Sequence, residues 1–111
     1  MWRILLMHHE YKDLASLLKV VAEPNRLKIL EMLSCGEMCG YDILAHFNFT
    51  QPTLSHHMSI LEKSGLVNVR KDTKRHYYSL NSNKKEGLIS ELTQILFKTD
   101  HCICKDSHSN C

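Results

Sequence analysis

This chain of 111 residues has no long apolar run, few glycines and prolines, and only 7% aromatic residues. The apolar run nearest its start, Ile4–Met7, is too short for a membrane-spanning helix or for the core of a signal peptide. We therefore expect a cytoplasmic protein with no membrane partner. The sequence also lacks a phosphate-binding loop, paired carboxylates and an oriented Cys-His-Asp set, which argues against an enzyme. Its length and its 43% hydrophobic content predict one domain with its own core.

The charges of the chain are nearly balanced overall but unevenly distributed. The net charge is only +2, whereas residues 63–85 contain seven basic residues and one acid, a net charge of +6. The remainder of the chain carries −4. Such segregation favours a polyanion such as nucleic acid as the partner, and a solvated charged hairpin is the alternative.

Hydrophobic spacing predicts two helices in the first third of the chain. Leucines and valine at three- and four-residue intervals indicate a helix over residues 10–22, which ends before Pro24. Pro24 suits the first turn of a second helix, and Gly36 is its expected stop. The second helix is expected to bury one face, made of Leu27, Leu30 and Leu33.

A short third helix is predicted over residues 41–46, followed by a turn at residues 48–50 and a fourth helix. Thr50 is the expected N-cap of this fourth helix, which covers residues 51–63 and is closed by Gly65. Its predicted core side consists of Leu54, Met58 and Leu61.

After Gly65 the apolar period changes from 3.6 to 2, which predicts a β-hairpin with a charged turn at residues 71–74. A last helix is predicted over residues 84–98, with an apolar stripe. We thus expect a mostly α fold with a β-hairpin wing (α+β). The expected division is an N-terminal extension (1–9), a folded domain (10–98), whose DNA-binding and dimerisation roles are argued from the features below, and a cysteine-containing tail (99–111). The apolar stripe of the last predicted helix (84–98) consists of Leu88, Leu92, Ile95 and Leu96.

Two short helices followed by a basic hairpin are typical of a winged helix-turn-helix, whose second helix enters the major groove of DNA. Short hydroxyl and amide side chains suit base recognition, because they donate and accept hydrogen bonds. His57 lies beside the apolar side, so a satisfied, half-buried histidine is expected there. The alternative is a solvated helix face. The candidate DNA-contacting residues of the helix are Gln51, Thr53, Ser55, His56, Ser59 and Lys63.

Cations of the hairpin are candidates for phosphate or minor-groove contacts that position the protein on DNA. A role in solubility alone is the alternative. These residues are Arg70, Lys71, Lys74 and Arg75.

The first and last helices carry more apolar surface than so small a core can absorb. A homodimer through these helices would cover that surface and would place two recognition helices about one DNA turn apart. We therefore expect a palindromic operator in double-stranded DNA.

Five cysteines are the candidate metal ligands, with a pair in the middle of the chain and three in the tail. Thiolates select thiophilic ions such as As(III), Sb(III), Cd(II), Zn(II) and Pb(II). His101 and His108 could instead complete a Zn(II) site with the tail thiols. Structural or incidental thiols are the alternative. The five are Cys35, Cys39, Cys102, Cys104 and Cys111.

The stretch from Ala22 to Leu80 resembles repressors of the ArsR/SmtB family, and most closely the arsenical-resistance repressors of Gram-positive bacteria. The resemblance rests on Glu-Pro-Asn-Arg-Leu (23–27), Ser-Cys-Gly-Glu-Met-Cys (34–39) and Gln-Pro-Thr-Leu-Ser-His-His-Met (51–58). It implies a homodimer that blocks an operator until an inducer binds, As(III) or Sb(III) in the first instance. Metal-resistance genes are then expressed.

The resemblance also implies a thiol site with one departure. Cys39 falls on the first cysteine and Asp42 on the aspartate of the family's Cys-x-Cys-Asp motif, whereas Tyr41 replaces the second cysteine. Cys35 could substitute for it, or Cys39 could combine with Cys102 and Cys104. The last helix contains no histidine, which disfavours the family's Zn(II) site there.

Two other functions fit some of these features. A redox or polysulfide sensor on the same fold would form a disulfide or polysulfide between Cys35 and Cys39 or within the tail. A metal-storage protein would use the tail alone and would leave the basic segment unexplained. A repressor that senses Zn(II), Cd(II) or Pb(II) is a further alternative within the family.

Overall fold

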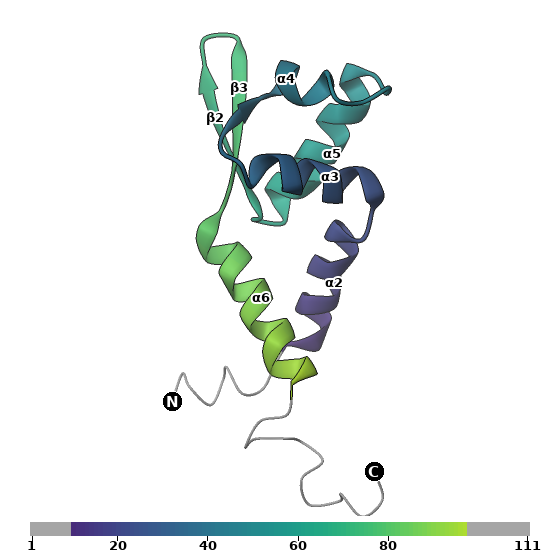
Figure 1. Cartoon of the computed structure of the whole chain (residues 1–111), viewed down its shortest axis with the longest axis vertical. Helices are drawn as coiled ribbons and strands as arrows, with labels where there is room; N and C mark the ends of the chain where they lie inside the picture. The colour runs from purple at the N-terminus through teal and green to yellow at the C-terminus, as the bar shows by residue number, and fades with distance from the viewer. Residues whose placement is uncertain (1–9, 98–111) are drawn as a thin grey trace, which may run out of the picture.

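A computed structural model describes residues 10–97 of the chain. Within these residues, five helices and three strands form a helical domain with a small sheet, and two outer helices, α2 and α6, extend away from it (Figure 1). The bounds are α2 (Tyr11–Val21), α3 (Pro24–Leu33), β1 (Met38–Cys39), α4 (Gly40–Leu44), α5 (Gln51–Lys63), β2 (Val67–Asp72), β3 (Arg75–Leu80) and α6 (Ser82–Leu96).

Local signals explain where the helices begin. Pro24 occupies the first turn of α3, and the Glu23 side chain accepts the backbone N–H of Arg26 at 2.8 Å. Asn81 caps α6 by accepting the backbone N–H of Lys84 at 2.9 Å. Thr50 stands at the predicted N-cap position of α5, but its side chain makes no capping hydrogen bond.

The sheet contains three antiparallel strands in the order β1-β3-β2. Strands β2 and β3 form the predicted hairpin, and their pairing narrows the turn to Thr73 and Lys74, with Thr73 at φ +56°. Strand β1 was not predicted, because two residues are too few to display a period of two. Met38 and Cys39 of this strand pair with Tyr78 and Tyr77.

The core lies where α3, α4 and α5 meet the sheet. Gly65, at φ +88°, lets the chain leave α5 and enter β2 directly, a backbone conformation that side chains disfavour. The buried cluster consists of Ile29, Leu33, Ile43, Leu54, Met58, Leu61, Leu66 and Val67.

The predicted core face of α3 is partly wrong, because Leu27 is 54% exposed. Three residues are less than one helical turn of 3.6 residues, so a spacing of three does not keep side chains on one side. Leu27 lies about 140° from the side that buries Ile29 and Leu33. The other helices differ from prediction only at their ends. Helix α4 covers residues 40–44 rather than 41–46, and α6 covers residues 82–96 rather than 84–98.

Removing buried side chains from α3 tests this revised core face. Leu33→Ala is expected to lower the free energy of unfolding by about 2–5 kcal/mol, because Leu33 is buried in the cluster. Leu27→Ala, the matched control, should cost about 0.5 kcal/mol or less. Urea denaturation at one protein concentration measures both values. Equal losses would show that Leu27 is covered in solution.

Candidate nucleic-acid interface and thiol segment

Helix α5 is buried along one side and open along the other. The predicted core residues Leu54, Met58 and Leu61 are at most 2% exposed, and His57 is 7% exposed. Thr53 and Ser59 are half-buried at the margins. The remaining candidate residues of this helix are exposed, namely Gln51, Ser55, His56 and Lys63.

His57 is held on the buried side by Arg26 of α3. Its Nδ1 lies 3.1 Å from a terminal guanidinium nitrogen of Arg26, and its ring is tilted against Phe49 with centroids 5.6 Å apart. Burial lowers the pKa of His57, and the nearby positive charge of Arg26 acts in the same direction. The pKa of the Glu23 carboxyl is also lowered, because it accepts the backbone N–H of Arg26.

The hairpin carries its cations on exposed positions, and two of them have partners within the protein. Arg70 donates two hydrogen bonds to Glu37, at 2.8 and 3.3 Å, and its guanidinium lies 4.5 Å from the ring centroid of Tyr77. This pairing raises the pKa of Arg70 and lowers that of Glu37. Arg75 lies 6.0 Å from the ring centroid of Tyr41 on α4. The exposed cations are Arg70, Lys71, Lys74 and Arg75.

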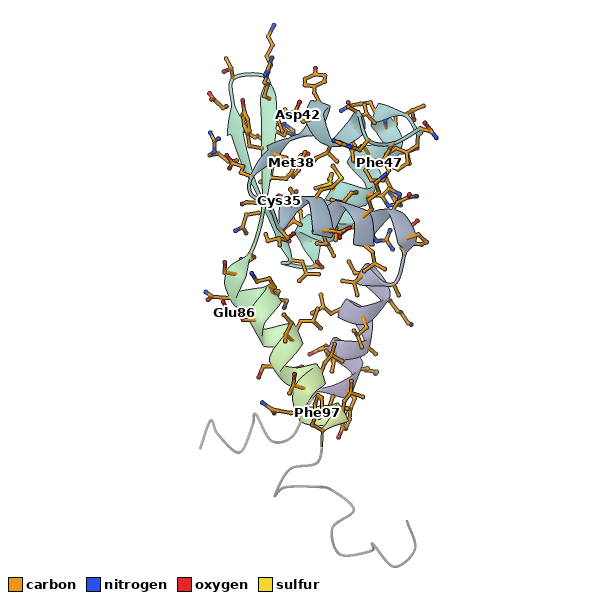
Figure 2. The ribbon with its side chains drawn as sticks, in the orientation of Figure 1. Cys35, Met38, Asp42, Phe47, Glu86 and Phe97 are labelled. Carbon is orange, nitrogen blue, oxygen red and sulfur yellow. The ribbon has the colours of Figure 1, made fainter. Side chains whose placement is uncertain are left out.

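The two central cysteines are four residues apart: Cys35 lies in the turn between α3 and β1 (Figure 2), and Cys39 lies in β1. Cys35 is exposed, and Cys39 is buried as the last residue of β1 and the N-cap of α4. Glu37, which binds Arg70, lies between them in sequence. A short segment therefore carries both thiols and contacts the wing through strand pairing and an ion pair.

No group of three or more His, Cys, Asp or Glu side chains within residues 10–97 is placed to hold a metal ion. The predicted ligands Cys102, Cys104 and Cys111 lie outside the described residues, as do His101 and His108. A thiolate site at Cys35 and Cys39 would consequently need a further ligand from elsewhere.

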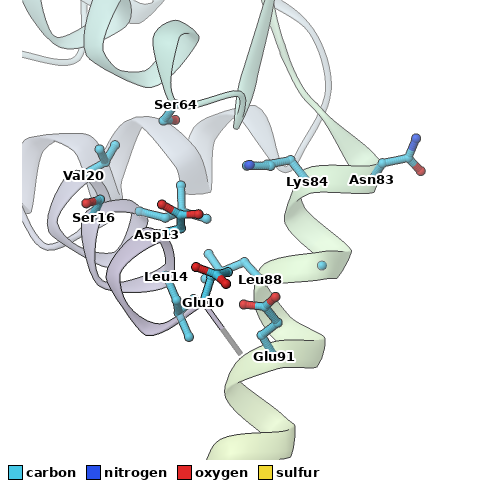
Figure 3. Close-up of a pocket in the computed structure, with 12 residues that line it drawn as sticks. Glu10, Asp13, Leu14, Ser16, Val20, Ser64, Asn83, Lys84, Leu88 and Glu91 are labelled. Carbon is cyan, nitrogen blue, oxygen red and sulfur yellow. The ribbon is translucent and has the colours of Figure 1, made fainter. Parts of the chain in front are cut away.

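Helices α2 and α6 enclose a cleft of about 570 Å³ (Figure 3). Leu14 and Leu88 lie inside it beside the carboxylates of Asp13 and Glu91. Helix α6 has no buried residue. No described helix is both long and apolar enough to cross a membrane. The large exposed apolar residues of α2, α6 and its C-cap are Tyr11, Ile89, Ile95, Leu96 and Phe97.

Three contacts were not expected from the sequence. Arg26 contacts His57, Glu37 contacts Arg70, and Tyr41 lies under Arg75. These contacts join positions 31 to 34 residues apart in sequence, so no local pattern could reveal them. The one available sequence signal for these contacts was the acidic residue Glu37 between the two central cysteines.

A winged helix-turn-helix defines the class of this protein: α4 and α5 form the helix-turn-helix, and β2 and β3 form the wing. A solved structure described as a possible transcriptional regulator for arsenical resistance has the same fold, with a TM-score of 0.69 and 26% identity. The match covers 86% of this chain and 96% of that one. HlyU from Vibrio cholerae gives a TM-score of 0.65 at 31% identity, covering 78% and 94%.

Sequence comparison identifies the family. Residues 23–69 match the family described as bacterial regulatory protein, arsR family. Arsenical resistance operon repressors of Staphylococcus aureus and Staphylococcus xylosus are each 46% identical over 89% of this chain and 95% of theirs. The chain belongs to the ArsR family of DNA-binding transcriptional regulators, which confirms the predicted resemblance and a regulator rather than an enzyme.

Acidification is expected to destabilise the protein through His57. Because its native pKa is lowered from 6.5, the unfolded chain takes up this proton first. The contribution of neutral His57 to the free energy of unfolding is complete above about pH 6.5 and is lost as the pH falls further. His57→Asn keeps an acceptor without titrating, so it should lose less stability than wild type between about pH 7.5 and pH 5.5.

Urea midpoints at the two pH values measure this difference. His46→Asn, which removes an exposed histidine, is the control and should behave like wild type. An identical pH dependence in His57→Asn and wild type would contradict the assignment.

Proposed function

We propose that this protein is a cytoplasmic repressor that binds a palindromic operator as a homodimer and releases it on binding a thiophilic ion, As(III) or Sb(III). The observation that carries the proposal is a thiol-bearing segment joined to the helix-turn-helix and the wing. Its relatives at 46% identity are named arsenical resistance operon repressors. Control of metal-resistance genes follows from that likeness.

The proposed DNA surface combines α5 with the wing. Gln51, Ser55 and His56 are exposed at the N-terminal half of α5, where base edges are usually contacted. Wing cations bind phosphates and orient the protein without reading sequence. Arg70 would have to exchange Glu37 for a phosphate or keep both, so Glu37 weakens the contribution of this cation to DNA binding.

The proposed dimer forms through α2 and α6. These helices present apolar side chains that the described part of one protomer leaves uncovered, including Ile89, Ile95 and Leu96. A second copy has the same surface, so a two-fold contact would bury both sets at once. Two recognition helices would then face the two halves of a palindrome.

The proposed inducer site uses Cys35 and Cys39 with thiols of the tail. Soft thiolates suit As(III) and Sb(III), and they also bind Zn(II), Cd(II) and Pb(II). Cys35 is accessible to an arriving ion, whereas Cys39 is buried and must move toward it. Cys102, Cys104 and Cys111 are the available further ligands.

Movement of Cys39 supplies the coupling between inducer and DNA. Cys39 pairs with Tyr77 in β3 and starts α4, so its displacement disturbs the wing and the helix-turn-helix together. The inducer needs only to bind the DNA-free arrangement more tightly than the DNA-bound arrangement. A coupling of about 1–3 kcal/mol would lower operator affinity by roughly 5- to 150-fold.

A thiol redox switch is the second candidate, favoured by the exposure of Cys35 four residues before Cys39. Titration of the reduced protein on DNA from its own promoter, followed by fluorescence anisotropy, separates the candidates. As(III), Sb(III), Zn(II), Cd(II) and a peroxide or polysulfide are added in parallel. Release by As(III) supports the arsenical repressor, release by oxidant alone supports the redox switch, and absence of DNA binding overturns both.

Ser55→Ala combined with His56→Ala is expected to weaken operator binding by about 1–3 kcal/mol, because both exposed side chains face the proposed groove. Anisotropy measures affinity, and analytical ultracentrifugation should give the wild-type oligomeric state. Glu31→Gln, on the exposed surface of α3, is a control expected to bind as wild type does. Unchanged affinity in the double variant would mean that another surface reads the DNA.

Cys39→Ser is expected to preserve operator binding and blunt its release by As(III). Serine nearly matches the size of cysteine but provides no thiolate for a soft ion. The concentration of As(III) that releases half of the DNA measures the effect. Ser34→Ala, at the exposed end of α3, is the control. A wild-type response of Cys39→Ser would remove Cys39 from the site.

A further inference from the structure

Arg26 connects three helices at the corner between α2 and α3. Its side-chain Nε donates to the carbonyl oxygen of Val20 in the last turn of α2, at 2.6 Å. A terminal nitrogen of the same guanidinium lies 3.1 Å from Nδ1 of His57 on α5. One planar group thus joins the proposed dimerisation helix to the recognition helix, while its own backbone belongs to α3.

The surroundings of this contact keep it in place. Glu23 accepts the backbone N–H of Arg26 and also faces His57, and Asn25 donates to the second oxygen of Glu23 at 3.5 Å. The His57 side chain is nearly buried and lies against the ring of Phe49. The charged or titratable groups that act on His57 are Glu23, Arg26 and His56.

Neutral His57 can accept at Nδ1 from the permanently charged guanidinium, whereas protonated His57 has no acceptor and would repel it. The rigid fork of arginine holds two donors at a fixed separation. Lysine has a single flexible ammonium and cannot reproduce that geometry. The contact is therefore suited to fixing an angle between helices as well as to stabilising the fold.

We propose that Arg26 is a positioning residue that locks α5 to α2 and thereby sets the half-site spacing that the dimer accepts in DNA. The inference rests on the proposed function, because spacing has meaning only for a dimer that reads two half-sites. Each added base pair moves one half-site by about 3.4 Å and turns it by about 35°. A recognition helix that is loosely held tolerates this change, and one that is firmly held does not.

The experiment compares operator duplexes from the protein's own promoter that have the native spacing or one base pair more or less. Anisotropy gives the ratio of affinities for native and altered spacing. Wild type should prefer the native spacing strongly, and Arg26→Gln should reduce that preference several-fold while remaining folded and dimeric. Lys28→Gln is the matched control, because it also removes a cation and a hydrogen bond to a backbone carbonyl, that of His46, without reaching α2 or α5.

A pH series keeps the test informative where Arg26→Gln fails to fold. Acidification of wild type should relax the spacing preference as His57 takes up a proton, and His57→Asn should keep its preference constant. The ratio of affinities at each pH cancels any effect of pH that is common to all the duplexes.

The outcomes separate the two proposals. Wild type that binds none of the duplexes overturns the proposed function. Wild type that binds them all equally, or a folded Arg26→Gln with the wild-type ratio, overturns the positioning role alone. A loss of affinity at every spacing with an unchanged ratio would likewise reduce Arg26 to a residue that only stabilises the fold.

Discussion

The arrangement of the whole domain depends on the burial of one side of α5. Leu54, Met58 and Leu61 are removed from water against α3, α4 and the start of β2, and this burial fixes the rotation of the helix about its axis. The opposite side, with Ser55 and His56, is consequently exposed. The polar contact from Arg26 to His57 adds a directional interaction to this non-directional packing.

The same small core connects the thiols to the wing. The domain is small, and β1 joins the sheet by pairing directly with β3. Cys39 thereby belongs at once to the core, the sheet and the beginning of α4. A displacement of its side chain would therefore disturb all three.

Most helices and the hairpin could be predicted, because each has a local cause. Helix α5 was predicted with its observed bounds, since Pro52 in the first turn and Gly65 after the end mark both limits. The exposure of its polar side was also predicted from the 3.6-residue period. Leu27 was misplaced because α3 carries apolar residues on opposite sides, and only packing decides which side is buried.

The order of elements, the basic segment and the family follow from the chain without its fold, because helix periodicity, turn residues, charge and short motifs are local features. The burial of Cys39, the exposure of Cys35 and the contact between Glu37 and Arg70 arise only when the chain folds. The link that Arg26 makes between α2 and α5 likewise arises only then. These contacts join residues that are distant in sequence, and their geometry exists only after the core has closed.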